Sequence, residues 1–85
     1  MATYEVVFRK SVEKDLRAIP RKDQIRILQR LSQLADEPRP SGCKKLSGQE
    51  RYRLRQGNYR ILYEIEDDRL IVTVVKVGDR RDVYG

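Results

Sequence analysis

The chain has 85 residues, a net charge of +6, one cysteine and no histidine. A chain of this length supports one small domain with a thin core, so we expect residues 1–85 to form a single domain. The absence of histidine removes the usual zinc sites and histidine acid–base pairs, and a lone Cys43 excludes an internal disulfide. No signal peptide or long apolar segment is apparent, so we expect a cytoplasmic protein with no membrane contact, metal or small-molecule cofactor.

The first half of the chain predicts a strand followed by two helices. Residues 3–8 are rich in β-branched and aromatic side chains, which is typical of a strand. A first helix follows, with Ser11 as its candidate N-cap and Pro20 at its end. A second helix is predicted over residues 22–35. Apolar residues recur at helical spacing in both: Val12, Leu16 and Ile19 in the first, and Ile27, Leu31, Leu34 and Ala35 in the second.

The second half predicts three or four antiparallel strands. Residues 44–46 follow a connector rich in proline and glycine and form a short edge strand or the approach to one. Residues 52–63 (YRLRQGNYRILY) contain two strands joined at Gly57 and Asn58, a strong turn signal. Residues 70–77 (LIVTVVKV) predict a central strand covered on at least one face. We therefore expect an α+β fold, in which two N-terminal helices pack on one face of a small, mainly antiparallel sheet.

The positive charge is concentrated in one quarter of the chain. Residues 39–60 hold seven basic residues and one acidic residue, and this surplus of six is the whole excess of the chain. Strand alternation puts Arg51, Arg53 and Arg55 on one face, and the turn brings Arg60 beside Arg55. Such a cluster repels itself unless it meets an anion, and the planar fork of arginine suits phosphate. We predict a polyanionic partner; a solubilising surface is the alternative interpretation. Four cations on the solvated side of the second helix would help to hold a large polyanion: Arg21, Lys22, Arg26 and Arg30.

The basic face can perform chemistry on RNA without histidine or a metal. Cationic donors stabilise the charge that develops on a pentacoordinate phosphorus and can protonate a leaving oxygen. RNA supplies its own nucleophile, the 2′-hydroxyl. A protein that aligns this hydroxyl with the next phosphate and neutralises the developing charge can therefore cleave RNA. Tyrosines near the arginines would stack on a splayed base.

The segment from Tyr52 to Tyr84, YRLRQGNYRILYEIEDDRLIVTVVKVGDRRDVY, resembles the C-terminal half of the RelE/ParE toxin superfamily. It is most similar to RelE-type messenger-RNA interferases of bacterial toxin–antitoxin systems. The N-terminal half agrees in layout, so the resemblance covers essentially the whole chain. It implies a ribosome-dependent endoribonuclease that cleaves messenger RNA in the A site by 2′-hydroxyl attack and thereby inhibits translation. It also implies a RelB-like antitoxin, the ribosome and messenger RNA as partners.

The resemblance further implies roles for individual residues. Arg60 and Arg80 would bind and neutralise the scissile phosphate, with Arg80 a candidate proton donor, and Tyr84 would stack on or orient the substrate. Some relatives carry lysine where this chain has Arg53; because arginine stays protonated, Arg53 is expected to stabilise charge, and the general base is unassigned. The expected catalytic residues are Arg53, Arg60, Arg80 and Tyr84, and the expected RNA- and ribosome-binding residues are Arg51, Arg55, Lys44, Lys45 and Arg81.

Two alternatives to the nuclease stay open. One is a ParE-like protein that inhibits gyrase by binding it, although ParE-like proteins generally lack the basic and tyrosine set on the last strands. The other is an RNA- or ribosome-binding domain without turnover. Aspartate stands at position 79 where many relatives have histidine, and this difference favours the second alternative.

Overall fold

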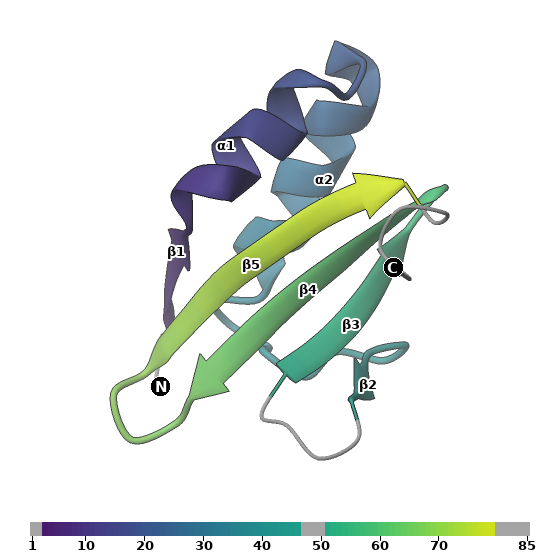
Figure 1. Cartoon of the computed structure of the whole chain (residues 1–85). Coiled ribbons are helices and arrows are strands. Elements are labelled where there is room, and N and C mark those ends of the chain that lie inside the picture. The colour runs from purple at the N-terminus through teal and green to yellow at the C-terminus, as the bar shows by residue number, and fades with distance from the viewer. Residues whose placement is uncertain (1–2, 47–50, 80–85) are drawn as a thin grey trace.

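The computed structural model describes residues 3–46 and 51–79, which form five strands and two helices (Figure 1). The elements follow the predicted order of one strand, two helices and then further strands. They are β1 (Glu5–Phe8), α1 (Lys10–Arg17), α2 (Arg21–Gln33), β2 (Lys44–Lys45), β3 (Arg51–Gln56), β4 (Tyr59–Glu66) and β5 (Ile71–Asp79).

The strands form one mixed sheet in the order β1-β5-β4-β3-β2 (Figure 1). β1 lies parallel to β5 at one edge, and every other neighbouring pair is antiparallel. The two helices carry the chain across a face of the sheet before β2, so the antiparallel meander begins at the far edge and returns toward β1. The predicted α+β fold with a mainly antiparallel sheet is confirmed.

Both helices cover the same face of the sheet and leave the other face open (Figure 1). In β3, the alternation predicted from the sequence turns Tyr52 and Leu54 toward the helices, where both are buried. The helical repeat in α2 buries Ile27 and Leu31 against them. The core consists of Val12, Ile19, Ile27, Leu31, Leu34, Tyr52, Leu54, Ile61, Tyr63, Ile65, Val72, Val74 and Val77.

The start of α1 differs from the prediction. The helix begins at Lys10, its N-cap is Arg9, and Ser11 is an exposed residue of the first turn. The reason is that the Arg9 N–H still bonds to the Val74 carbonyl (3.1 Å), so the β1 ladder continues up to the helix. The prediction that Ser11 caps this helix is wrong.

Neither helix in the described ranges has the length and apolar character needed to span a membrane.

A β-bulge interrupts the pairing of β4 with β5. Leu62 pairs with Lys76 and Tyr63 with Val74, which leaves Val75 as an extra residue in β5. Strict alternation after the core residue Val74 would turn positions 76 and 78 toward the helices. The bulge reverses this order, because Val77 enters the core and Lys76 joins Leu62 on the open face.

An exposed cluster of polar side chains joins the β4–β5 turn to two other segments. Arg39, in the connector after α2, donates two hydrogen bonds to the Asp67 carboxylate (3.1 and 2.8 Å) and one from Nε to the Tyr52 hydroxyl (3.1 Å). The Tyr4 hydroxyl also donates to Asp67 (2.7 Å). These contacts, first that from Arg39 and then that from Tyr4, lower the pKa of Asp67 to about 2.

We expect Asp67→Asn to lower the melting temperature near neutral pH. The folded-state pKa lies below the ordinary value of 3.8, so ionised Asp67 stabilises the fold fully above about pH 4, and this contribution disappears as the pH falls toward 2. The difference between parent and variant should therefore shrink between pH 4 and pH 2 in thermal melts followed by circular dichroism. Asp68→Asn, which removes a carboxylate from the same turn, is the control; equal pH profiles for the two variants would contradict this role.

Candidate functional site

The open face of the sheet carries the arginines of β3 and β4. Because paired residues of neighbouring strands share a face, the register decides which side chains lie in one row. It places Arg60 directly beside Arg55, as predicted from the turn at residues 57–58. Across β3, β4 and β5, the rows are Arg51–Glu64–Thr73, Arg53–Leu62–Lys76 and Arg55–Arg60–Gly78.

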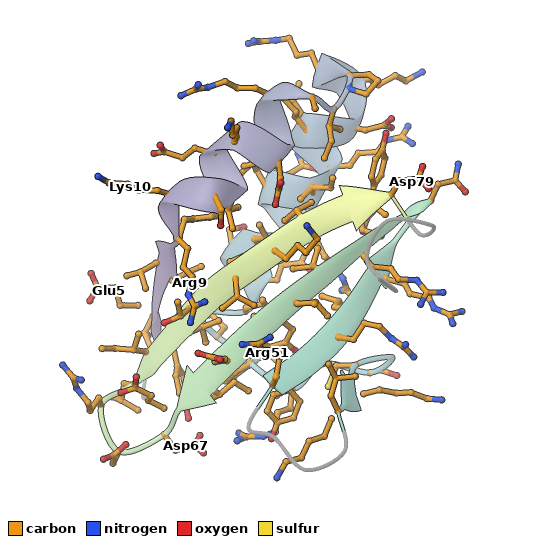
Figure 2. The ribbon with its side chains drawn as sticks, in the orientation of Figure 1. Glu5, Arg9, Lys10, Arg51, Asp67 and Asp79 are labelled. Atoms are coloured by element: carbon orange, nitrogen blue, oxygen red, sulfur yellow. The ribbon has the colours of Figure 1, made fainter. Side chains whose placement is uncertain are left out.

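A carboxylate balances one end of this face. Arg51 Nη2 lies 3.0 Å from Glu64 Oε2, and Arg9 Nη2 lies 3.5 Å from Glu64 Oε1. Figure 2 shows Arg9 and Arg51 on the same side of the sheet. The chain itself therefore supplies an anion for part of the arginine cluster. Arg51, expected to bind RNA, is held by an ion pair within the sheet.

The other end of the face contains a buried guanidinium. Arg60 is only 4% exposed and is the one buried charged residue in the described part of the chain. In β5 its pairing partner is Gly78, which has no side chain and so leaves room for the aliphatic part of the arginine. Because little water screens a buried charge, a guanidinium here acts strongly on an anion that reaches it.

A small hollow adjoins Arg60 at the β3–β4 turn. Its volume is about 70 Å³, and its lining includes Arg55, Arg60 and Tyr59. The Tyr59 hydroxyl donates to Asp23 Oδ2 of α2 (3.2 Å), which ties the turn to the helix layer. Burial, and then this hydrogen bond, raise the pKa of Tyr59, so the phenol stays a neutral donor.

The remaining expected site residues lie in different places. Lys44 pairs with Arg53 and extends its row to the edge strand, whereas Lys45 pairs with Tyr52 and so belongs to the helix side of β2. Arg80, Arg81 and Tyr84 lie outside the described residues, so their placement stays a prediction.

Two residues of the open face were not identified from the sequence. Lys76 lies in the row of Arg53 because of the bulge, and the nearly continuous apolar run around it gives too little alternation to place it. Glu64 faces Arg51 through the register of the hairpin. The turn at Gly57 and Asn58 sets that register, so counting outward from the turn would have found Glu64.

Comparisons with known proteins are consistent across sequence and fold. Residues 6–84 match the family described as the ParE toxin of the type II toxin–antitoxin system parDE. A putative RelE-like toxin protein of Escherichia coli is 31% identical to this chain in a match that covers 95% of this chain and 90% of that protein. Toxin RelG of Mycobacterium tuberculosis is 29% identical over 95% of each chain. A chain of the archaeal RelE–RelB complex from Pyrococcus horikoshii OT3 has a TM-score of 0.84 at 30% identity, covering 94% of this chain and 98% of its own.

We expect Glu64→Gln to strengthen binding to a polyanion, because it releases Arg9 and Arg51 from their shared carboxylate. The salt concentration needed to elute the protein from immobilised heparin measures this effect. Glu66→Gln is the matched control, since it removes the same charge from an exposed pair with Arg69 at the β4–β5 turn. Both pairs are partly exposed, so each variant should lose at most about 1 kcal/mol of stability. Equal elution of the two variants would show that the charge balance of the open face is unimportant.

Proposed function

The chain belongs to the RelE/ParE toxin superfamily of type II toxin–antitoxin systems, and we propose that it is a ribosome-dependent endoribonuclease that cleaves messenger RNA in the A site. Cleavage of the message would arrest translation. The proposal is supported by the cationic open face, where Arg55 and Arg60 share one row and Arg53 lies in the next. The observation that carries it is the burial of Arg60 at the end of this face.

The proposed reaction is an in-line displacement at phosphorus. The 2′-oxygen of one nucleotide attacks the adjacent phosphate and loses its proton to a base that is not assigned. The bond from phosphorus to the 5′-oxygen breaks, giving a 2′,3′-cyclic phosphate and a 5′-hydroxyl. Negative charge grows on the non-bridging oxygens, and Arg60 stabilises it in a setting with little water. Arg53 and Arg55 hold the neighbouring phosphates.

Two roles in this mechanism rest on the resemblance to RelE-type enzymes. Arg80 protonates the leaving 5′-oxygen, and Tyr84 stacks on or orients the substrate. Arg81 contributes to RNA binding. The role proposed for Arg60 depends on its burial in the described part of the sheet and not on these three residues.

Inhibition of gyrase by binding is the second candidate. It is favoured by the description of the matching family, which names the ParE toxin. Gyrase inhibition requires no chemistry at phosphorus, so it gives no reason for a buried guanidinium beside Arg55. An RNA-binding domain without turnover would use the same cations but would leave messages intact.

To test the nuclease, the protein is induced in a bacterial host and new messenger-RNA ends are mapped on a translated message and on a copy without a start codon. We expect cuts in frame with codons on the translated message only. On programmed ribosomes, Arg60→Ala should lower the single-turnover cleavage rate by about 10²- to 10³-fold, the effect of losing one strong donor to a developing anion.

Two further variants make this result interpretable. Arg60→Lys keeps a positive charge in the buried position. Its melting temperature, compared with that of the parent, shows whether a lower cleavage rate comes from lost chemistry or from lost folding. Arg69→Ala, an exposed arginine at the β4–β5 turn, is the control and should cleave at the parent rate. Intact transcripts together with an early collapse of DNA supercoiling would favour gyrase. Cleavage by Arg60→Ala at the parent rate would refute the proposed site.

We also propose a cognate RelB-like antitoxin. Its support is the set of related toxins solved in complexes with RelB, from Mycobacterium tuberculosis to Pyrococcus horikoshii. A short segment that folds on binding can cover a large surface and place acidic groups near the arginines. The product of a neighbouring small reading frame should therefore co-purify with the toxin and block cleavage. Full cleavage activity in the presence of that product would exclude it as the antitoxin.

A further inference from the structure

A second basic feature lies at the edge of the sheet, beside the helix layer. β2 pairs only with Tyr52 and Arg53 among the described residues, and Figure 1 shows it beside one end of β3. Beyond Arg53 along the chain, the outer edge of β3 lies next to α2. Two hollows of about 340 Å³ each lie there, and they share Arg30 of α2 and Arg55 of β3. We call the two hollows together the α2–β3 furrow.

The α2–β3 furrow is lined by cations and amides. No carboxylate is among its described lining residues, whose other members are glutamines, glycines and Leu54. Arg30 Nη1 donates to the Gln33 amide oxygen (3.2 Å), which orients its guanidinium. Within residues 3–46 and 51–79, no ion pair involves Arg26, Arg30 or Arg55. The five cations that line the furrow are Arg26, Arg30, Lys44, Arg53 and Arg55.

The chemistry of the lining favours a nucleic-acid backbone over a protein segment. Protein interfaces depend on apolar or aromatic anchors that enter pockets. The apolar side chain in the lining, Leu54, is 1% exposed and so offers a docking helix almost no contact area. Guanidinium forks instead match phosphate oxygens, and amides suit sugar hydroxyls and base edges.

Arg55 connects the α2–β3 furrow to the proposed cleavage site. It lines both large hollows and also the hollow of about 70 Å³ beside Arg60. A single RNA strand at Arg60 therefore has a continuous cationic path around the edge of β3. We propose that the α2–β3 furrow binds the sugar–phosphate backbone of the RNA segment that flanks the scissile phosphate. This proposal rests on the nuclease function proposed above, because that function makes RNA the substrate.

The test measures RNA binding separately from cleavage. A fluorescent 12-nucleotide 2′-O-methyl RNA cannot be cut by 2′-hydroxyl attack, and its anisotropy is followed with the full chain over a range of salt concentrations. Arg26→Gln/Arg30→Gln removes two furrow charges and retains polar side chains. Each phosphate contact to a single strand contributes about 0.7 to the slope of log K against log salt, so the slope should shrink by about 1.4. Affinity near physiological salt should fall about 10-fold or more.

Lys14→Gln/Arg17→Gln is the matched control, because it removes two exposed charges from the last turn of α1, away from the furrow. Its salt slope and its cleavage rate on programmed ribosomes should equal those of the parent. Arg26 is exposed, so the single variant Arg26→Gln, with an expected slope change of about 0.7, covers the case in which the double variant does not fold. An unchanged slope in the folded furrow variants would overturn the proposal.

Two other results separate this proposal from its alternatives. If the furrow variants bind RNA like the parent but lose affinity for a synthetic acidic peptide, the furrow takes a protein segment and the RNA proposal is wrong. If Arg60→Ala cleaves at the parent rate while the furrow variants lose RNA, the proposed cleavage site fails and the furrow stands. If the furrow variants lose only as much RNA affinity as Lys14→Gln/Arg17→Gln, the effect is one of net charge and the proposal is wrong.

Discussion

One extra residue in β5 decides which side chains meet at the far end of the sheet. With Val75 inserted, Val77 enters the core and Gly78 lies opposite Arg60 on the open face. Beyond the end of β1, this part of β5 is held by α1, since the Val77 N–H donates to Asp15 Oδ2 (3.2 Å). Without the bulge, a core-facing position would fall at residue 78, and the row that contains Arg60 would be lost. The position of the candidate site is therefore a consequence of a backbone irregularity stabilised by a helix side chain.

The open face has an internal electrostatic order. Glu64 contacts both Arg9 and Arg51 at one end, so the field there is weakened by a carboxylate within 3.5 Å of each guanidinium. At the other end, Arg60 is buried and lies beside Arg55. Water screens a charge least where it is buried, so an anion that reaches the β3–β4 turn would meet the least screened guanidinium of this face. Composition alone, with a surplus of six in one quarter of the chain, gives no such direction.

The parts of this structure that were predictable from sequence are those governed by local periodicity. Alternation in β3 separates Tyr52 and Leu54 from the arginines, and Gly57 with Asn58 fixes the hairpin that brings Arg60 beside Arg55. The bulge was not predicted, because the nearly continuous apolar run of residues 70–77 has only Thr73 and Lys76 as polar positions, which is too few to define an alternation. The burial of Arg60 depends in turn on the bulge, and the parallel position of β1 depends on long-range packing. The α2–β3 furrow needed the tertiary structure, since Arg30 and Arg55 are 25 positions apart.

Helix α2 gives the furrow its rigidity. Ile27 and Leu31 are buried in the core, and Arg26 and Arg30 each precede one of them by a single position. One residue rotates the side-chain direction by about 100° on a helix, so a wall of cations stands at a fixed angle to the core face. Fully burying an isoleucine or leucine contributes roughly 1.5–3 kcal/mol, which is far more than an exposed arginine gains from any one surface contact. The core thus sets the position of the backbone that carries the cations, so a bound strand would have to order the arginine side chains but not the helix.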